Sequence, residues 1–252
     1  MTQNPDIRIK THDEQMLMWE AGKLLSRVVA DLKSSLKIGM TTAEVDAIAE
    51  SLIASSGALP AFKGYRGYPA TICISVNEEV IHGIPGPRVI RDGDIVGIDI
   101  GLIHKEFYSD MAVTVGFGSL TGARQRLIDV TRQALLKGIA EARPGNRLGD
   151  ISHAIQEYVE SKGFSVVRDF VGHGIGRELH EDPEIPNYGP ARKGPLLQSG
   201  MVFAIEPMVN MGVEHTKVLP DGWTAVTMDG KPSAHFEHTV AITESGPVIL
   251  TE

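Results

Sequence analysis

The sequence has only one cysteine, Cys73, among its 252 residues. A lone thiol cannot form an intramolecular disulfide, and it cannot supply the several thiolates of a structural zinc site. This composition fits a reducing compartment. Cys73 is also a poor candidate nucleophile, because the sequence identifies no base to activate it. We therefore expect a cytoplasmic protein without disulfide bonds.

Positive charge and long apolar runs are scarce as well. Lys and Arg number 24 against 32 Asp and Glu, which gives a formal net charge of -8 at pH 7. Nucleic acid or an anionic membrane would require a clustered basic surface, and none is visible. Residues 1–15 lack the apolar core of a signal peptide, and no later run approaches the roughly 18 apolar residues of a membrane span. The expected partner is peptide-like or small.

Two capping boxes mark a first pair of helices. Thr11 with Glu14 precedes a run of apolar residues at helical spacing, and Thr41 with Glu44 precedes a second run. Gly57 ends the second helix, since glycine readily adopts the left-handed conformation that closes a helix. The pattern then changes to the alternation that is typical of strands.

A second pair of helices begins near Thr121. Its apolar spacing breaks at Pro144, resumes and stops at Gly163. A shift of 106 residues, which lays Gly39 on Gly145, brings the apolar positions of the two pairs into register. The two halves of the sequence therefore share one pattern of helices.

Two strand-like segments repeat in a similar way. DIVGIDIG and MVFAIEPM fall within one residue of the same shift, and VIHGIP has an echo in VGHGIG at a shorter offset. A chain of 252 residues suits one generous core better than several ordinary domains. We predict a single domain over residues 1–252, built from half-repeats at about 13–115 and 120–250 that close over one another.

Acidic residues interrupt several of the apolar strands. The alternation around Asp99 sets it opposite the packing face formed by Ile98 and Ile100. The gap from Asp99 to Asp110 suits a hairpin with its loop near residues 104–108. Both carboxylates can then lie on the same face of the sheet.

Glu206 and Glu237 follow the same rule, because each stands opposite a buried aromatic, Phe203 and Phe236 respectively. Clustered and buried carboxylates repel one another, so cations must join them. Two divalent ions balance four carboxylates, and a neutral imidazole from His173 completes an oxygen-rich set of ligands. Such a set suits Mn, Fe, Co or Zn. A pair of these ions activates water and polarises a carbonyl, which is hydrolase chemistry.

His173 and His180 lie in the segment VGHGIGRELHEDP, where three glycines and a proline disfavour a helix. An irregular or extended backbone must therefore position both imidazoles. A dinucleotide site would need a helix after these glycines, which the proline-rich segment that follows cannot form. No GxSxG motif is present, so a serine hydrolase has no starting point.

The sequence resembles the type I methionine aminopeptidases of bacterial kind over nearly its whole length. The segments that carry the resemblance occur in the order and spacing of that family: ISVNEEVIHGIP, GDIVGIDIG, VGHGIGRELHEDP, FAIEPMV and FEHTVAIT. The resemblance implies an α+β fold of the pita-bread type, with two pseudo-symmetric halves whose antiparallel sheet is covered by helices. That architecture agrees with the internal repeat.

The resemblance also implies roles for single residues. Glu206 would transfer the proton of a hydroxide that bridges the metals and attacks the first peptide carbonyl. His180 would stabilise the carbonyl oxygen, and His82 would assist near the scissile amide. The free α-amine would be held at the metal on the side of Asp99. The implied ligands of two divalent metal ions are Asp99, Asp110, His173, Glu206 and Glu237, with Asp110 and Glu237 bridging.

A pocket for the methionine side chain is implied by the same resemblance. An apolar and aromatic lining suits a flexible thioether, although ordinary core packing would explain the same residue types. The lining positions are Tyr65, Tyr68, Cys73, Leu179 and Trp223. This sequence departs from many relatives at Gly101, Ser109, Leu179 and His235. None of these departures removes an implied metal ligand.

The function implied is removal of the initiator methionine from new chains whose second residue is small. The substrate would be the N-terminal peptide of a nascent protein, the ribosome is a candidate partner, and a monomer is expected. One alternative is a proline-directed aminopeptidase of the same fold, such as aminopeptidase P or prolidase. Such enzymes usually carry an added N-terminal domain, for which this length leaves no room. The other is a catalytically silent pita-bread protein that binds partners or RNA.

The remaining histidines have no motif that recommends them for catalysis. His235 stands two positions before Glu237 on the same face, which leaves a role beside the metals open, although we expect none. Surface or core positions are also expected for His12, His104, His153, His215 and His238.

Overall fold

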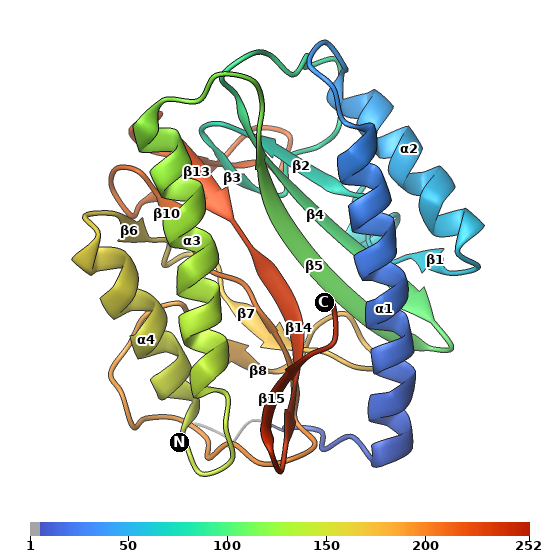
Figure 1. Ribbon diagram of the computed structural model, residues 1–252, viewed down its shortest axis with the longest axis vertical. Coiled ribbons are helices and arrows are strands. Elements are labelled where there is room, and N and C mark those ends of the chain that lie inside the picture. Colours follow the sequence, from blue (N-terminus) through green and yellow to red (C-terminus); the bar gives the residue numbers. More distant parts are fainter. Residues whose placement is uncertain (1–5) are drawn as a thin grey trace.

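The computed structural model describes residues 6–252, and four long helices frame it in two pairs (Figure 1). One pair is α1 (His12–Ser35) with α2 (Thr42–Ser55), and the other is α3 (Gly122–Glu141) with α4 (Leu148–Ser161). A short 3-10 turn, Tyr65–Gly67, follows the first pair. Within residues 6–252, no helix combines the length and apolar character needed to cross a membrane.

The predicted helix signals are confirmed. Thr11 and Thr41 each accept a hydrogen bond from the backbone N–H of the glutamate three residues later, and each glutamate returns a bond to the threonine backbone. Gly57 has a φ of 76° just beyond α2. The start of α4 lies 106 residues after the start of α2, and both have 14 residues. This match supports the two half-repeats, whose division stays a prediction.

All paired strands run antiparallel, and most belong to one nine-stranded sheet. Its order is β1-β4-β5-β14-β9-β7-β8, with β2 paired to β4 and β15 paired to β14. Two three-stranded sheets complete the fold, in the orders β13-β10-β6 and β11-β12-β3. The strands are β1 (Leu59–Pro60), β2 (Cys73–Val76), β3 (Glu79–Ile81), β4 (Ile95–His104), β5 (Phe107–Gly116), β6 (Ser165–Val166), β7 (Gly172–Gly174), β8 (Glu181–Ile185), β9 (Val202–Ile205), β10 (Met208–Asn210), β11 (Thr216–Val218), β12 (Ala225–Thr227), β13 (Ser233–His235), β14 (Glu237–Thr243) and β15 (Gly246–Ile249).

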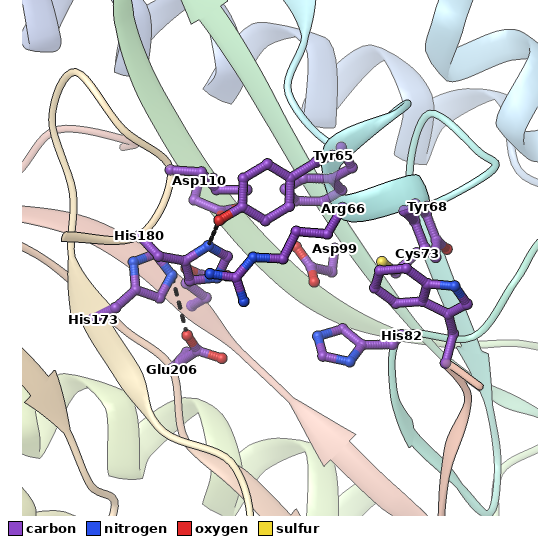
Figure 2. A pocket seen from close by; sticks show the side chains of 14 residues that line it. Tyr65, Arg66, Tyr68, Cys73, His82, Asp99, Asp110, His173, His180 and Glu206 are labelled. Carbon is purple, nitrogen blue, oxygen red and sulfur yellow. Dashed lines mark hydrogen bonds and ion pairs between the residues drawn. The ribbon is translucent and has the colours of Figure 1, made fainter. Parts of the chain in front are cut away.

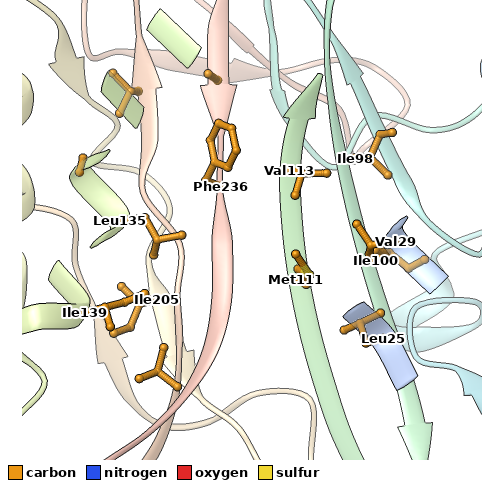
Figure 3. Packing of buried hydrophobic residues seen from close by; sticks show 14 of the residues in the cluster. Leu25, Val29, Ile98, Ile100, Met111, Val113, Leu135, Ile139, Ile205 and Phe236 are labelled. Atoms are coloured by element: carbon orange, nitrogen blue, oxygen red, sulfur yellow. The ribbon is translucent and has the colours of Figure 1, made fainter. Parts of the chain in front are cut away.

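The main core lies between the helices and one face of the large sheet. In Figure 3, Leu25 of α1 faces Ile100 of β4, while Leu135 of α3 lies beside Ile205 and Phe236. These strand residues have the parity that the alternation assigned to the packing face. The carboxylates next to them in sequence therefore point to the opposite face.

The β4–β5 hairpin is longer and its loop shorter than the sequence indicated. Both strands extend into the predicted loop at 104–108, so that only Lys105 and Glu106 connect them. The two residues have φ values of 47° and 68°, the left-handed pair that a two-residue turn between twisted strands requires. The register pairs Asp99 with Ala112 and Gly101 with Asp110. Asp99 and Asp110 therefore share a face, as predicted.

Candidate metal centre

Four strands of the large sheet, together with the residue that directly follows a fifth strand, β9, bring one side chain each to the same face. β4, β5, β14, β9 and β7 are consecutive in the sheet. Ala112, next to Asp110 on that face, pairs with Asp99 on one side and Glu237 on the other, while His173 pairs with Ala204, two residues before Glu206. The residues so aligned are Asp99, Asp110, Glu237, Glu206 and His173.

Three of these residues form the tightest group. Asp110, His173 and Glu237 each offer one ligand atom, and these atoms lie within 4.8 Å of one another. Glu206 adjoins them, with its Oε1 3.5 Å from Nε2 of His173. Asp99 completes the cluster from the neighbouring strand β4, where it lines the same pocket and has a buried Oδ1. The structure thus brings together all five predicted ligands.

Burial raises the pKa values of all four carboxyl groups, and repulsion by neighbouring acids adds to the rise for Asp99, Asp110 and Glu237. Burial raises the pKa of Asp99 to about 7, with the charge of His235 opposing the rise and that of Glu206 adding to it. Burial also raises the pKa of Glu206 to about 7, against the opposing effect of His173. The pKa values of Asp110 and Glu237 are raised well above their ordinary range by burial and by the other acids. Protein groups alone therefore do not balance this cluster.

The donor set fits a divalent cation. Oδ1 of Asp99 and Oε1 of Glu237 are buried and have no hydrogen-bond partner within residues 6–252. Burial of an anionic oxygen without a partner costs free energy. A divalent metal ion can bind several such oxygens at once and so removes this cost. Carboxylates and one imidazole hold Mn, Fe, Co or Zn equally well by ligand type. Metal binding by this site follows from its chemistry.

The backbone fixes the form of His173. Its Nδ1 lies 2.9 Å from the carbonyl oxygen of Gly174, which can only accept, so Nδ1 carries the proton. Nε2 then presents a lone pair toward the carboxylates. A hydrogen bond from the second ring nitrogen to a carbonyl is the usual way in which proteins orient a metal-binding histidine.

One pocket opens onto this cluster and is lined by all five ligand candidates. Its open space is about 670 Å³ including the mouth, and all twelve residues predicted for the site line it. Figure 2 shows Asp110, His173 and Glu206 on one side and Tyr68, Cys73 and His82 on the other, with Asp99 between them. Phe62 and Arg66 also line the pocket and were not predicted. Their only sequence signal is their position in AFKGYRGYP, beside the predicted Tyr65 and Tyr68.

The apolar end of the pocket is rigidly held. The Tyr68 hydroxyl lies 3.1 Å from the carbonyl oxygen of Ile72 and 3.0 Å from that of Gly83, and its ring meets Trp223 edge-on at 5.0 Å. Cys73 is buried there, and burial raises the pKa of its thiol. Cys73 is therefore a neutral apolar side chain, in agreement with the argument against a nucleophilic role.

His180 stands at the mouth of the pocket with one edge exposed. Its Nδ1 lies 2.8 Å from the hydroxyl of Tyr65, and its ring centroid is 4.3 Å from that of His173 (Figure 2). Burial, then the neighbouring His173 and Arg66, lower the pKa of His180 to about 3. The imidazole is therefore neutral at pH 7.

His82 enters the pocket from a strained backbone position. It follows β3 with a φ of 58°, which is uncommon for a residue other than glycine and marks functional sites. Its ring meets those of Phe170 and Trp223 edge-on. Burial and the nearby His235 lower the pKa of His82 to about 4, so this imidazole is neutral as well.

His235 has a contact with the site that the sequence does not lead us to expect. Its Nε2 lies 3.6 Å from Oε2 of Glu206 and has no hydrogen-bond partner within residues 6–252. Two hydrogen bonds between its backbone and Thr114 hold the residue in place. The signal in the sequence for this position is that His235 and Glu237 share one face of the chain. His238, by contrast, bonds to Thr251 away from the site, as expected.

Comparison with known proteins agrees with this site. Metallopeptidase family M24 matches residues 16–244. Methionine aminopeptidase 1 of Bacillus subtilis is 54% identical over 96% of this chain and 98% of its own length. The methionine aminopeptidase of Clostridium perfringens is 55% identical, over 97% of this chain and 98% of its own.

Solved structures show the same relationship. The methionine aminopeptidase of Thermotoga maritima has a TM-score of 0.96 at 49% identity, covering 98% of this chain and 99% of that chain. The prolidase of Pyrococcus furiosus has a TM-score of 0.78 at 26% identity, and the match covers 65% of its length. These likenesses confirm the expected pita-bread fold. The chain belongs to metallopeptidase family M24 and, within it, to the type I methionine aminopeptidases.

Proposed function

We propose that this protein hydrolyses the first peptide bond of chains that begin with methionine and continue with a small residue. The observation that carries the proposal is the meeting of five potential metal ligands with an apolar, aromatic cavity in one pocket. A peptidase site needs both: a centre that activates water and a cavity that selects one side chain. The identity to methionine aminopeptidases supports the choice of side chain.

The proposed cofactor is a pair of divalent ions held by Asp99, Asp110, His173, Glu206 and Glu237. The four negative charges of the carboxylates balance the four positive charges of two divalent ions, and the neutral imidazole adds a nitrogen ligand. Asp110 and Glu237 are the proposed bridging ligands. When bound, the ions lower the pKa of water and polarise the carbonyl that it attacks. Co, Mn, Fe and Zn all suit the ligand types.

Three side chains are proposed to act on the substrate. Glu206 lies beside the imidazoles of His173 and His235, where its carboxylate can accept a proton from water and return it. If the Tyr65 hydroxyl donates to Nδ1 of His180, then Nε2 of His180 carries a proton directed at the carbonyl oxygen. His82, which lines the same pocket, is proposed to bond the scissile amide.

The apolar end of the pocket is proposed to hold the methionine side chain. A thioether has no strong hydrogen-bonding group, and it packs favourably against aromatic rings and sulfur. The α-amine would then reach the acidic cluster at Asp99, which excludes a preceding residue and makes the enzyme an exopeptidase. The proposed lining is Tyr65, Tyr68, Cys73, Leu179 and Trp223, with Phe62 added by the structure.

The proposed function also implies a cellular location, a partner and an oligomeric state. An enzyme that trims new chains works in the cytoplasm as they are made, with the ribosome as a candidate partner. A monomer suffices, because every residue of the proposed site belongs to one chain.

A peptide panel tests the substrate class. We expect Met-Ala and Met-Gly peptides to be cleaved at least 100-fold faster in kcat/KM than Leu-Gly and Ala-Pro peptides, because the apolar cavity and the aromatic rings around it select the thioether. The measurement is release of the first amino acid from metal-loaded protein. Preferential cleavage of Ala-Pro would move the protein to the proline-directed enzymes.

Substitution of His180 tests its separation from metal binding. His180→Ala is expected to lower kcat by about 100- to 1000-fold, as removal of a donor to a developing oxyanion does. Metal content should stay at the wild-type value, because no ligand is lost. Elemental analysis and steady-state kinetics on the same preparation check both halves of this expectation; a loss of metal would assign His180 a different role.

Gly101 and Phe62 provide a test of pocket shape. A Cβ at Gly101 would lie 2.7 Å from the Phe62 ring and 3.0 Å from Cβ of Ala61. Gly101→Thr should therefore displace the ring, destabilise the protein by about 1–3 kcal/mol and raise KM for Met-Ala peptides. Urea unfolding and kinetics measure these effects. The double variant Gly101→Thr/Phe62→Leu should recover part of the lost stability. If it does not, the threonine introduced at position 101 does not act by displacing the Phe62 ring.

A further inference from the structure

The N-terminal segment before α1 lies against the loop that carries His180. This loop, residues 175–180, joins β7 to β8 and includes Leu179, so it contributes two lining residues to the pocket. His180 borders the pocket on one side. His180 also borders a second hollow, which Asp6 and Arg8 line. A segment that is remote in sequence thus supports the back of the loop.

A buried ion pair joins the two segments. Nζ of Lys10 lies 2.6 Å from Oε2 of Glu181, and the exposed fractions of the two side chains are 6% and 3%. Nζ also donates to the carbonyl oxygen of Arg8 at 3.2 Å, and the backbone N–H of Lys10 donates to Gly200 at 2.7 Å. Lys10 is therefore held in place by bonds that do not involve the loop.

The same carboxylate ties the loop together. Oε1 of Glu181 accepts from the backbone N–H groups of Arg177, at 2.9 Å, and Glu178, at 3.4 Å. Gly176 leaves the room for this arrangement, since a Cβ there would lie 2.5 Å from Oε1 of Glu181 and 2.7 Å from Cε of Lys10. Glu181 thus links the loop amides to Lys10, and it directly follows His180 in the chain.

We propose that Lys10 and Glu181 are a positioning pair that holds the 175–180 loop so that His180 meets Tyr65 and faces the reacting carbonyl. The pair touches no substrate and acts only through His180. The inference rests on the proposed function to the extent that His180 contacts the substrate. A buried charge pair suits this task because each partner is strongly bound to one geometry.

Lys10→Met and Glu181→Gln test the proposal, since each keeps the approximate shape of the side chain and removes its charge. We expect kcat on a Met-Ala peptide to fall 10- to 100-fold, with KM within about threefold and unchanged metal content. Lys105→Met, which breaks the exposed Lys105–Glu20 pair, is the matched control and should keep full activity.

Combination with His180→Ala separates positioning from general damage. If the pair acts through His180, the double variant Lys10→Met/His180→Ala should be no slower than His180→Ala alone. The proposal would be overturned if the losses of kcat in the two single variants multiplied in the double variant. It would also be overturned if the single variants were as active as Lys105→Met. Lys10→Arg, which keeps the charge, should restore most of kcat.

Hydrogen exchange gives a readout that needs no activity. The amides of Arg177 and Glu178 should exchange at least tenfold faster in Glu181→Gln than in the wild type, while amides of α3 stay unchanged. This result decides the question even if Lys10→Met does not fold. Wild-type protein that fails to cleave any Met-Ala peptide would refute the proposed function, whereas unchanged exchange in Glu181→Gln would refute the positioning pair alone.

Discussion

Replacement of Glu237 by alanine is expected to remove most bound metal and to lower kcat/KM on a Met-Ala peptide by at least about 1000-fold, or roughly 4 kcal/mol. The reason is the position of Glu237 within 4.8 Å of the ligand atoms of Asp110 and His173, at the centre of the five strands. Loss of its carboxylate leaves two members of the tightest group. His173→Ala should act in the same way.

The control for this experiment lies on the same strand. His238 follows Glu237 directly, but its Nδ1 bonds to Thr251 at 2.8 Å, on the other side of β14. His238→Gln should therefore keep both metal and activity. Elemental analysis after reconstitution should approach two ions per chain for the wild type and for this control. Full activity in Glu237→Ala would refute the ligand assignment.

Metal removal should make the protein less stable as the pH rises. A carboxyl group whose pKa is raised on folding holds its proton more tightly in the folded state, so deprotonation opposes folding. For Asp99 and Glu206, with pKa values of about 7, the penalty is absent below pH 4, grows as the pH rises and is complete above pH 7. Since each pKa unit is worth about 1.4 kcal/mol, chelated protein should lose a few kcal/mol between pH 4.5 and 8.

Urea unfolding at several pH values, with chelator or with Mn²⁺, measures this effect. The ions should restore the stability of the wild type at pH 8, because they replace the missing protons as partners of the carboxylates. Glu206→Gln removes one charge, so its metal-free form should be more stable at pH 8 than the metal-free wild type, although the enzyme is inactive. A chelated wild type with no such pH dependence would argue that the four acids do not form a cluster.

The local features of the fold could be predicted because neighbouring residues determine them. The reciprocal bonds of Thr11 with Glu14 depend on a spacing of three residues, and the face on which Asp99 lies depends on alternation alone. The two left-handed residues Lys105 and Glu106 were harder to foresee. Neither is glycine or asparagine, so the tight turn that lengthens the hairpin carries no composition signal.

The order of strands could not be derived from local patterns. β14 lies between β5 and β9, although it comes last of the three in the chain, and this places Glu237 beside Ala112. The family resemblance, rather than periodicity, identified Glu237 as a partner of Asp110. Phe62 and Arg66 were missed because a pocket wall is defined by tertiary distance. The contact of His235 was missed for the same reason, since its partner Glu206 lies about 30 residues earlier in the chain, between β9 and β10.

The alignment of the five side chains across β4, β5, β14, β9 and β7 has a consequence for biosynthesis. The five side chains come together only after β14 has been synthesised and has paired with β5 and β9, which precede it in the chain. A chain that lacks β14 therefore lacks a complete metal site. Metal binding at this centre would therefore depend on the completed sheet, because Glu237 of β14 lies within 4.8 Å of the ligand atoms of Asp110 and His173.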